Sequence, residues 1–230
     1  KETIKTGIES AIQGGYSAIC PMANTKPFND NAQTLMYMIA KAKETAEIGF
    51  YPICAVTKGL ESEKLVNVSQ LIELGAAAFS DDGKPVENMR LLREALKYIN
   101  SLGKIIISHS EDSSLAYGGV INEGRVSEKL GLKGIPNITE SLAVARELEI
   151  VRSVNGRYHF AHISTKRSVE LIRQAKKEGL LITAETAPHY FSLTEDDIKD
   201  YEAKYKVNPP LRTKSDLKAI IEGLQDGTID

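Results

Sequence analysis

The feature that most constrains the fold is an alternation of short apolar runs with longer amphipathic segments. The apolar runs consist mainly of small, β-branched and aromatic residues, and polar side chains do not alternate regularly within them. This pattern is typical of strands that are covered on both faces. The runs lie at residues 16–22, 50–56, 76–82, 104–110, 158–164 and 181–187. They predict the strands of a buried parallel sheet.

The segments between these runs have helical periodicity. Residues 31–48 have the pattern of a helix that covers a core with one face, on a stripe formed by Leu35, Met38, Ile39 and Ala42. Further helical segments are residues 1–14, 86–101, 138–154, 166–178 and 214–226. Alternating strands and helices predict either a closed (β/α)8 barrel or an open, doubly wound α/β sheet.

The number of predicted strands points to a partial barrel. Six strands are two fewer than a closed barrel contains, and a complete barrel usually takes about 250 residues. The chain has 230 residues, of which 42% are hydrophobic and 26% charged, as in an ordinary globular domain. It also opens and closes on helical patterns, which is unusual for such a barrel. We therefore expect residues 1–230 to form a single, truncated barrel domain with six of the eight strands.

Composition excludes several classes of function. The net charge is −2, and no long block of like charge suggests a nucleic-acid surface. No apolar run approaches the ~20 residues that span a bilayer, and no leader pattern opens the chain. Cys20 and Cys54 each lie in an apolar run, which predicts buried structural thiols in a reducing cytoplasm.

Polar residues follow the predicted strands at the end where α/β proteins carry their chemistry. Three of the four histidines lie at or just beyond such an end, which is an uncommon arrangement. The residues in these positions, in chain order, are Asn24, Asp81, Asp82, Gly83, His109, His162 and His189.

Each of these residues also has an ordinary structural interpretation. His109 is either a core histidine or a metal ligand or acid–base group. His159 and His162 are three residues apart, so they face opposite sides of a strand, and His162 is nearer the carboxyl end. We therefore expect His159 to be structural. Asp81 and Asp82 also point to opposite sides, so one is a candidate ligand unless both belong to a simple turn. One aspartate and two histidines are a ligand set that zinc accepts.

Several motifs, in order and in spacing, resemble one known family. They are GGYSAICPMANTKP, AAAFSDDGKPV, IIISHSED, HFAHISTKRSVELI, ITAETAPHYFSLTEDDI and KVNPPLR. Together they are similar to the class I bacterial dihydroorotases of the amidohydrolase superfamily, over essentially the whole chain. The resemblance implies a (β/α)8 TIM barrel of the metal-dependent amidohydrolase type.

The resemblance also implies roles for particular residues. Asp82, His109 and His162 match metal ligands of the family, which binds one or two Zn²⁺ per subunit in the complete enzyme. Asn24 and Asn208 match residues that contact the substrate. The family's first-strand HxH motif and its eighth-strand aspartate, the proton shuttle, do not occur between residues 1 and 230. We therefore expect this stretch alone to be inactive, with an incomplete zinc site and its catalytic acid–base group unassigned.

One departure from the family pattern is local. Ala23 stands where the family usually has the proline of its PNT motif, which could loosen the loop that carries Asn24.

The activity implied by the resemblance is interconversion of N-carbamoyl-L-aspartate and L-dihydroorotate in de novo pyrimidine biosynthesis. The implied partners are a small-molecule substrate, a second subunit in a homodimer and, as a candidate, aspartate transcarbamoylase. A rival interpretation is another cyclic amidase, such as an allantoinase or hydantoinase. Hydantoinases carry a carboxylated lysine at the metal-bridging position, whereas the SDDG run has none. Two further interpretations are a non-catalytic scaffold for the transcarbamoylase and an open six-stranded binding module.

Overall fold

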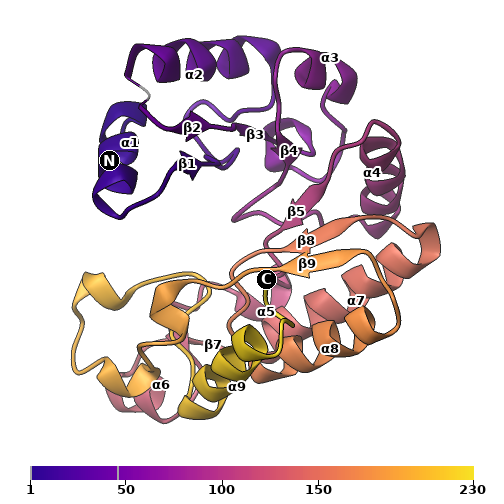
Figure 1. The fold of residues 1–230 in the computed structure, drawn as a ribbon. Coiled ribbons are helices and arrows are strands. Elements are labelled where there is room, and N and C mark those ends of the chain that lie inside the picture. Colours follow the sequence, from indigo (N-terminus) through magenta and orange to yellow (C-terminus); the bar gives the residue numbers. More distant parts are fainter. Residues whose placement is uncertain (1, 46) are drawn as a thin grey trace. The chain divides into compact units, whose positions relative to one another are not determined.

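The structure is a computed structural model that describes residues 2–45 and 47–230 (Figure 1). The chain divides into two compact units, Lys1–Ile107 and Ser108–Asp230. Lys1 and Ala46, which fall in the predicted helical segments 1–14 and 31–48, lie outside the described residues. Within the described ranges, none of the helices is long and apolar enough to cross a membrane.

The first unit follows the predicted alternation of strands and helices. In chain order its elements are α1 (Ile4–Gln13), β1 (Ala18–Ile19), α2 (Ala32–Thr45), β2 (Gly49–Phe50), β3 (Ile53–Cys54), α3 (Val68–Glu73), β4 (Ala78–Phe79), α4 (Met89–Ser101) and the start of β5 (Ile106–Ser108). The pairs β1–β2, β3–β4 and β4–β5 are all parallel.

The predicted strand at 50–56 contains β3 and overlaps β2 by one residue, and its two edges bond to different neighbours. On one side, the Tyr51 and Ile53 amides donate to the carbonyls of Ile19 and Pro21, at 2.9 and 3.0 Å. On the other side, β3 pairs with β4. A run that is bonded on both sides is an interior strand, which explains why its sequence is almost uniformly apolar.

The helices of this unit cover the strands with the predicted apolar faces. In α2, Leu35, Met38 and Ala42 of the predicted stripe are buried, and Ile39 is half-buried. In α4 the buried residues are Leu92, Ala95, Leu96 and Ile99. Asn88 begins α4 by accepting a hydrogen bond from the Leu91 amide at 3.1 Å. Burial of each large aliphatic side chain contributes about 1.5–3 kcal/mol, so these stripes fix the helices in place.

The second unit has the same pattern of alternation. Its elements are α5 (Ser113–Ala116), β6 (Ile121–Asn122), α6 (Arg125–Leu130), β7 (Gly134–Ile135), α7 (Ile138–Val154), β8 (Tyr158–Phe160), α8 (Lys166–Lys177), β9 (Ile182–Ala184) and α9 (Lys214–Gln225). β8 and β9 pair in parallel, as do β6 and β7. α8 lies between α7 and α9 and packs against both (Figure 1).

The two cysteines differ, and one prediction about them is wrong. Cys54 in β3 is fully buried, whereas Cys20 is exposed. Cys20 directly follows β1, which belongs to a sheet of only two strands in the described part of the chain, so its apolar neighbours do not cover it.

This difference predicts selective modification of the thiols. Burial raises the pKa of Cys54 to about 12, so almost none of it is thiolate at about pH 8. We expect iodoacetamide to alkylate one thiol of the native protein, and a Cys20→Ser variant to react only after unfolding. Mass spectrometry counts the adducts, and rapid double alkylation of native protein would contradict the buried position of Cys54.

Candidate metal centre

His109 lies at the carboxyl end of β5, as the sequence predicts. Two β-branched residues, Ile106 and Ile107, extend the backbone just before it, and β5 ends at Ser108. The His109 side chain is only 3% exposed. A histidine buried this deeply needs polar partners for both ring nitrogens.

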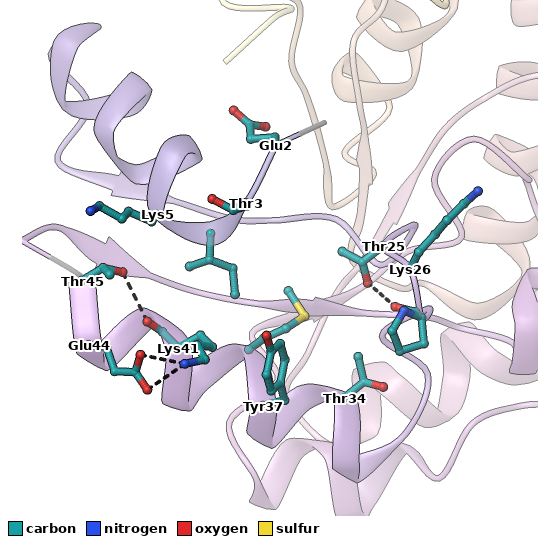
Figure 2. Close-up of a pocket in the computed structure, with 13 residues that line it drawn as sticks. Glu2, Thr3, Lys5, Thr25, Lys26, Thr34, Tyr37, Lys41, Glu44 and Thr45 are labelled. Atoms are coloured by element: carbon teal, nitrogen blue, oxygen red, sulfur yellow. Dashed lines mark hydrogen bonds and ion pairs between the residues drawn. The ribbon is translucent and has the colours of Figure 1, made fainter.

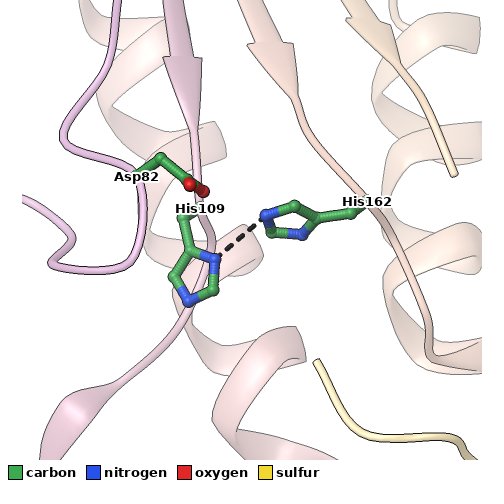
Figure 3. A group of neighbouring side chains, drawn as sticks. All are labelled: Asp82, His109 and His162. Carbon is green, nitrogen blue, oxygen red and sulfur yellow. Dashed lines mark hydrogen bonds between the residues drawn. The ribbon is translucent and has the colours of Figure 1, made fainter. Parts of the chain in front are cut away.

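His162 supplies the partner for one nitrogen. His109 Nδ1 and His162 Nε2 are 3.0 Å apart and hydrogen-bonded, with the two rings edge to face (Figure 3). The backbone reinforces this pairing, because the Ala161 amide donates to the Ser108 carbonyl at 3.0 Å. Two imidazole ligands at 2.0–2.1 Å from a tetrahedral zinc ion would have nitrogens about 3.3 Å apart. The pair therefore has nearly the spacing of two ligands of one metal ion.

Glu111 and Asn208 occupy the other side of the His109 ring. Glu111 Oε2 lies 3.6 Å from His109 Nε2, and the Asn208 side-chain nitrogen lies 3.4 Å from the same atom. Contact with His109 lowers the pKa of Glu111, which keeps the carboxylate charged at neutral pH. A carboxylate beside Nε2 favours a proton on that nitrogen, which leaves the Nδ1 lone pair available for a metal. This role of Glu111 was not predicted from the sequence, although its place two residues after His109 was the available signal.

Asp82 belongs to the first unit, in the turn that follows β4. Gly83 next to it has φ +75°, a left-handed backbone that glycine adopts without strain. The Asn24 side-chain amide donates to Asp82 Oδ2 at 2.8 Å, so two of the predicted site residues lie together. Asp82 is half-buried and Asn24 is exposed.

Asp81 points away from its neighbour and into the first unit. Its carboxylate accepts hydrogen bonds from the Val56 and Thr57 amides at 2.7 and 3.1 Å, and from the Thr57 hydroxyl. Burial raises the pKa of Asp81 to about 6. Asp81 therefore anchors the loop after β3.

His159 also has a structural partner, as predicted. Its Nδ1 lies 2.7 Å from the Thr183 hydroxyl on the neighbouring β9, and its Nε2 lies 3.6 Å from Glu185. These contacts link two strands.

A separate pocket of about 820 Å³ lies in the first unit, beside α1 and α2 (Figure 2). Lys41 and Glu44 form an ion pair of 2.8 Å on its wall, and the Thr25 hydroxyl donates to the Pro27 carbonyl. None of the predicted site residues lines this pocket.

Comparison with known proteins identifies the family. A family model described as dihydro-orotase-like matches residues 1–168, which is most of the chain. The chain belongs to the dihydroorotase-like family. Curated relatives in this family include the dihydroorotases of Desulforapulum autotrophicum and Acetivibrio thermocellus, 48% and 49% identical over 230 residues. The match covers all of this chain and 54% of each relative, so the chain spans about half their length.

Solved structures confirm the fold. The L-hydantoinase (dihydropyrimidinase) from Arthrobacter aurescens matches with a TM-score of 0.83 at 24% identity, over 99% of this chain and 52% of the hydantoinase. A D-hydantoinase from Bacillus sp. AR9 matches with a TM-score of 0.75 at 20% identity and the same coverage. At this level of identity the likeness concerns the fold alone. The predicted α/β fold of the amidohydrolase barrel type is therefore confirmed for the part that the chain spans.

Proposed function

We propose that the whole protein is a zinc-dependent cyclic amidohydrolase that interconverts N-carbamoyl-L-aspartate and L-dihydroorotate. The observation that carries this proposal is the pairing of His109 Nδ1 with His162 Nε2, with a carboxylate on the far side of the His109 ring. In a chain of the dihydroorotase-like family, this arrangement supports a metal-dependent reaction. We place the reaction in cytoplasmic pyrimidine biosynthesis.

Three residues would hold the metal. Asp82, His109 and His162 each offer one ligand atom, a carboxylate oxygen or an imidazole nitrogen, of the kinds that zinc accepts. When bound, zinc would polarise the ring carbonyl and lower the pKa of a bound water toward ~7. Glu111 would keep the proton of His109 on Nε2, so that Nδ1 stays a ligand.

Two asparagines would orient the substrate. Asn24 is held by Asp82, and Asn208 lies against His109, so both amides are next to proposed ligands. An amide can donate to a carboxylate and accept from a ring N–H, and dihydroorotate has both groups. A cyclic ureide that lacks the carboxylate would leave this donor without its partner, which would select against such a substrate.

A substrate comparison tests the proposal. With zinc added, we expect the whole protein to hydrolyse L-dihydroorotate with a higher kcat/KM than hydantoin or allantoin. A preference for hydantoin or allantoin would instead support a hydantoinase or an allantoinase. Failure to bind zinc, together with co-purification with aspartate transcarbamoylase, would support a non-catalytic scaffold.

Substitution of Asn208 gives a second test. We expect Asn208→Ala to raise KM for dihydroorotate by about 10-fold or more, because a lost hydrogen bond to a charged group costs about 1.5–3 kcal/mol. Asn100→Ala, in α4, is the matched control and should leave KM unchanged. Steady-state kinetics measures both, and an unchanged KM in Asn208→Ala would argue against substrate contact.

Three further features expected from the sequence stay predictions. They are a single domain at residues 1–230, a homodimer, and a complex with aspartate transcarbamoylase. Limited proteolysis tests the first, and light scattering with and without the transcarbamoylase tests the second and third.

A further inference from the structure

Helix α7 carries two buried carboxylates that the proposed reaction does not use. Glu140 and Glu147 are only 3% and 2% exposed. They are seven residues apart, which is two helical turns, so both lie on the same face about 10 Å apart along the axis. Buried glutamates are rare unless they are paired, so the partners of each carboxylate are informative.

Glu147 bonds to both neighbours of His109. The hydroxyls of Ser108 and Ser110 donate to Glu147 Oε2 at 2.7 and 2.8 Å. One carboxylate oxygen thus holds the residues immediately before and after the histidine. Burial raises the pKa of Glu147, and the two hydroxyl donors partly offset this effect.

Glu140 bonds to the segment that follows His162. The amides of Ser164 and Thr165 donate to its carboxylate at 3.1 and 2.9 Å, and the Thr165 hydroxyl donates at 2.9 Å. The Ser164 hydroxyl donates as well.

The backbone conformation of His162 explains why the segment after it needs these hydrogen bonds. Its φ is +40°, in the left-handed region that residues with a side chain rarely adopt. Such a conformation persists only where the surrounding structure holds it. The four donors of Ser164 and Thr165 begin two residues later, and Glu140 accepts all of them.

We propose that Glu140 and Glu147 are positioning residues, through which one rigid helix fixes the spacing of the His109 and His162 rings. Glu147 bonds to Ser108 and Ser110 beside His109, and Glu140 bonds to Ser164 and Thr165 just after His162. The inference rests on the proposed function, because the spacing of the two rings matters only if both bind the same metal ion. A site held by a helix is more precise than one held by loops alone.

The ring nitrogens of the metal-free protein give a direct test. Residues 1–230 contain four histidines, and substitution of each one assigns its signals in long-range ¹H–¹⁵N spectra of the imidazoles. We expect Glu147→Met to shift the ring signals of His109, and Glu140→Met to shift those of His162. The signals of His159, which bonds to Thr183, should stay in place and serve as the internal reference.

Two further variants separate positioning from stability. Val144→Ala removes two fully buried methyl groups of α7 between the two glutamates, so it should destabilise the protein without moving either ring signal. Glu140→Gln and Glu147→Gln each keep one acceptor oxygen and should restore much of the wild-type spectrum. If Glu147→Met does not fold, Ser110→Ala removes one of the same hydrogen bonds from the serine side.

Zinc affinity supplies the second measurement. We expect each Met variant to raise the zinc Kd about 10–100-fold, the usual effect of losing a residue that orients a ligand. Ring signals of the Met variants that match those of Val144→Ala would overturn the inference. If the wild-type protein binds no zinc, the proposed metal site fails, whereas the ring spectra still decide whether the two glutamates position the histidines.

Discussion

Replacing either His109 or His162 by alanine should weaken zinc binding by the protein more than 100-fold and abolish measurable hydrolysis of dihydroorotate. Loss of a residue that only orients a ligand costs about 10–100-fold in affinity, and a lost ligand should cost more. The two ring nitrogens lie 3.0 Å apart, so both substitutions remove part of the same centre. Competition with a chromophoric chelator measures the zinc Kd of each variant.

A third histidine provides the control for this experiment. His159 lies in β8, three residues before His162, and its Nδ1 bonds to the Thr183 hydroxyl on the neighbouring strand. His159→Ala should therefore keep wild-type zinc affinity. Wild-type affinity in both His109→Ala and His162→Ala would show that the paired rings are not metal ligands.

Substitution of Arg212 should have the largest effect on stability. This side chain is 4% exposed, and its Nη1 donates to Asn122 Oδ1, the Ile135 carbonyl and Asn137 Oδ1 at 2.9, 2.9 and 3.1 Å. Its Nε donates to the Ser164 hydroxyl at 3.2 Å. We expect Arg212→Met to lower the free energy of unfolding by about 3–5 kcal/mol, because the buried acceptors lose their charged donor. That is a large part of the ~5–15 kcal/mol by which a domain is stable.

An exposed arginine of the same unit makes the comparison specific. Arg125 pairs with Asp196, but its side chain is 75% exposed, so Arg125→Met should cost less than about 1 kcal/mol. The loss of stability in Arg212→Lys should fall between those of the two Met variants, because an ammonium group cannot reproduce the planar set of N–H donors of the guanidinium. Denaturant unfolding measures the change in the free energy of unfolding for all three variants. Similar changes for Arg212→Met and Arg125→Met would contradict a stabilising role for the buried hydrogen bonds of Arg212.

The long periodic segments could be predicted from the sequence. The stripes of α2 and α4 and the apolar runs around β3, β5 and β8 extend over enough residues for their period to be read. α3 has six residues, and β6 and β7 have two each, so none of them carries a recognisable period. Their positions depend on tertiary contacts.

The site was predictable only in part for a related reason. His109 and His162 were predicted because functional residues of α/β proteins lie at the carboxyl ends of the strands, and these ends could be located from the apolar runs. From the sequence alone, Glu140 and Glu147 would be assigned to the exposed face of a helix. They are buried because hydrogen-bond donors from segments distant in the sequence lie against them. Glu147, for example, bonds to a serine that is 39 residues earlier in the chain. No local pattern predicts such a contact.

The seven-residue spacing in α7 has a consequence for sequence change. Each residue of a helix turns it by about 100°, so one inserted or deleted residue between Glu140 and Glu147 would rotate one carboxylate off the shared face. Exchange of an exposed side chain there, such as Leu142, leaves the spacing intact. Homologous chains should therefore vary in composition between these two glutamates while keeping the length of the segment constant, and insertions designed into this helix belong after Glu147.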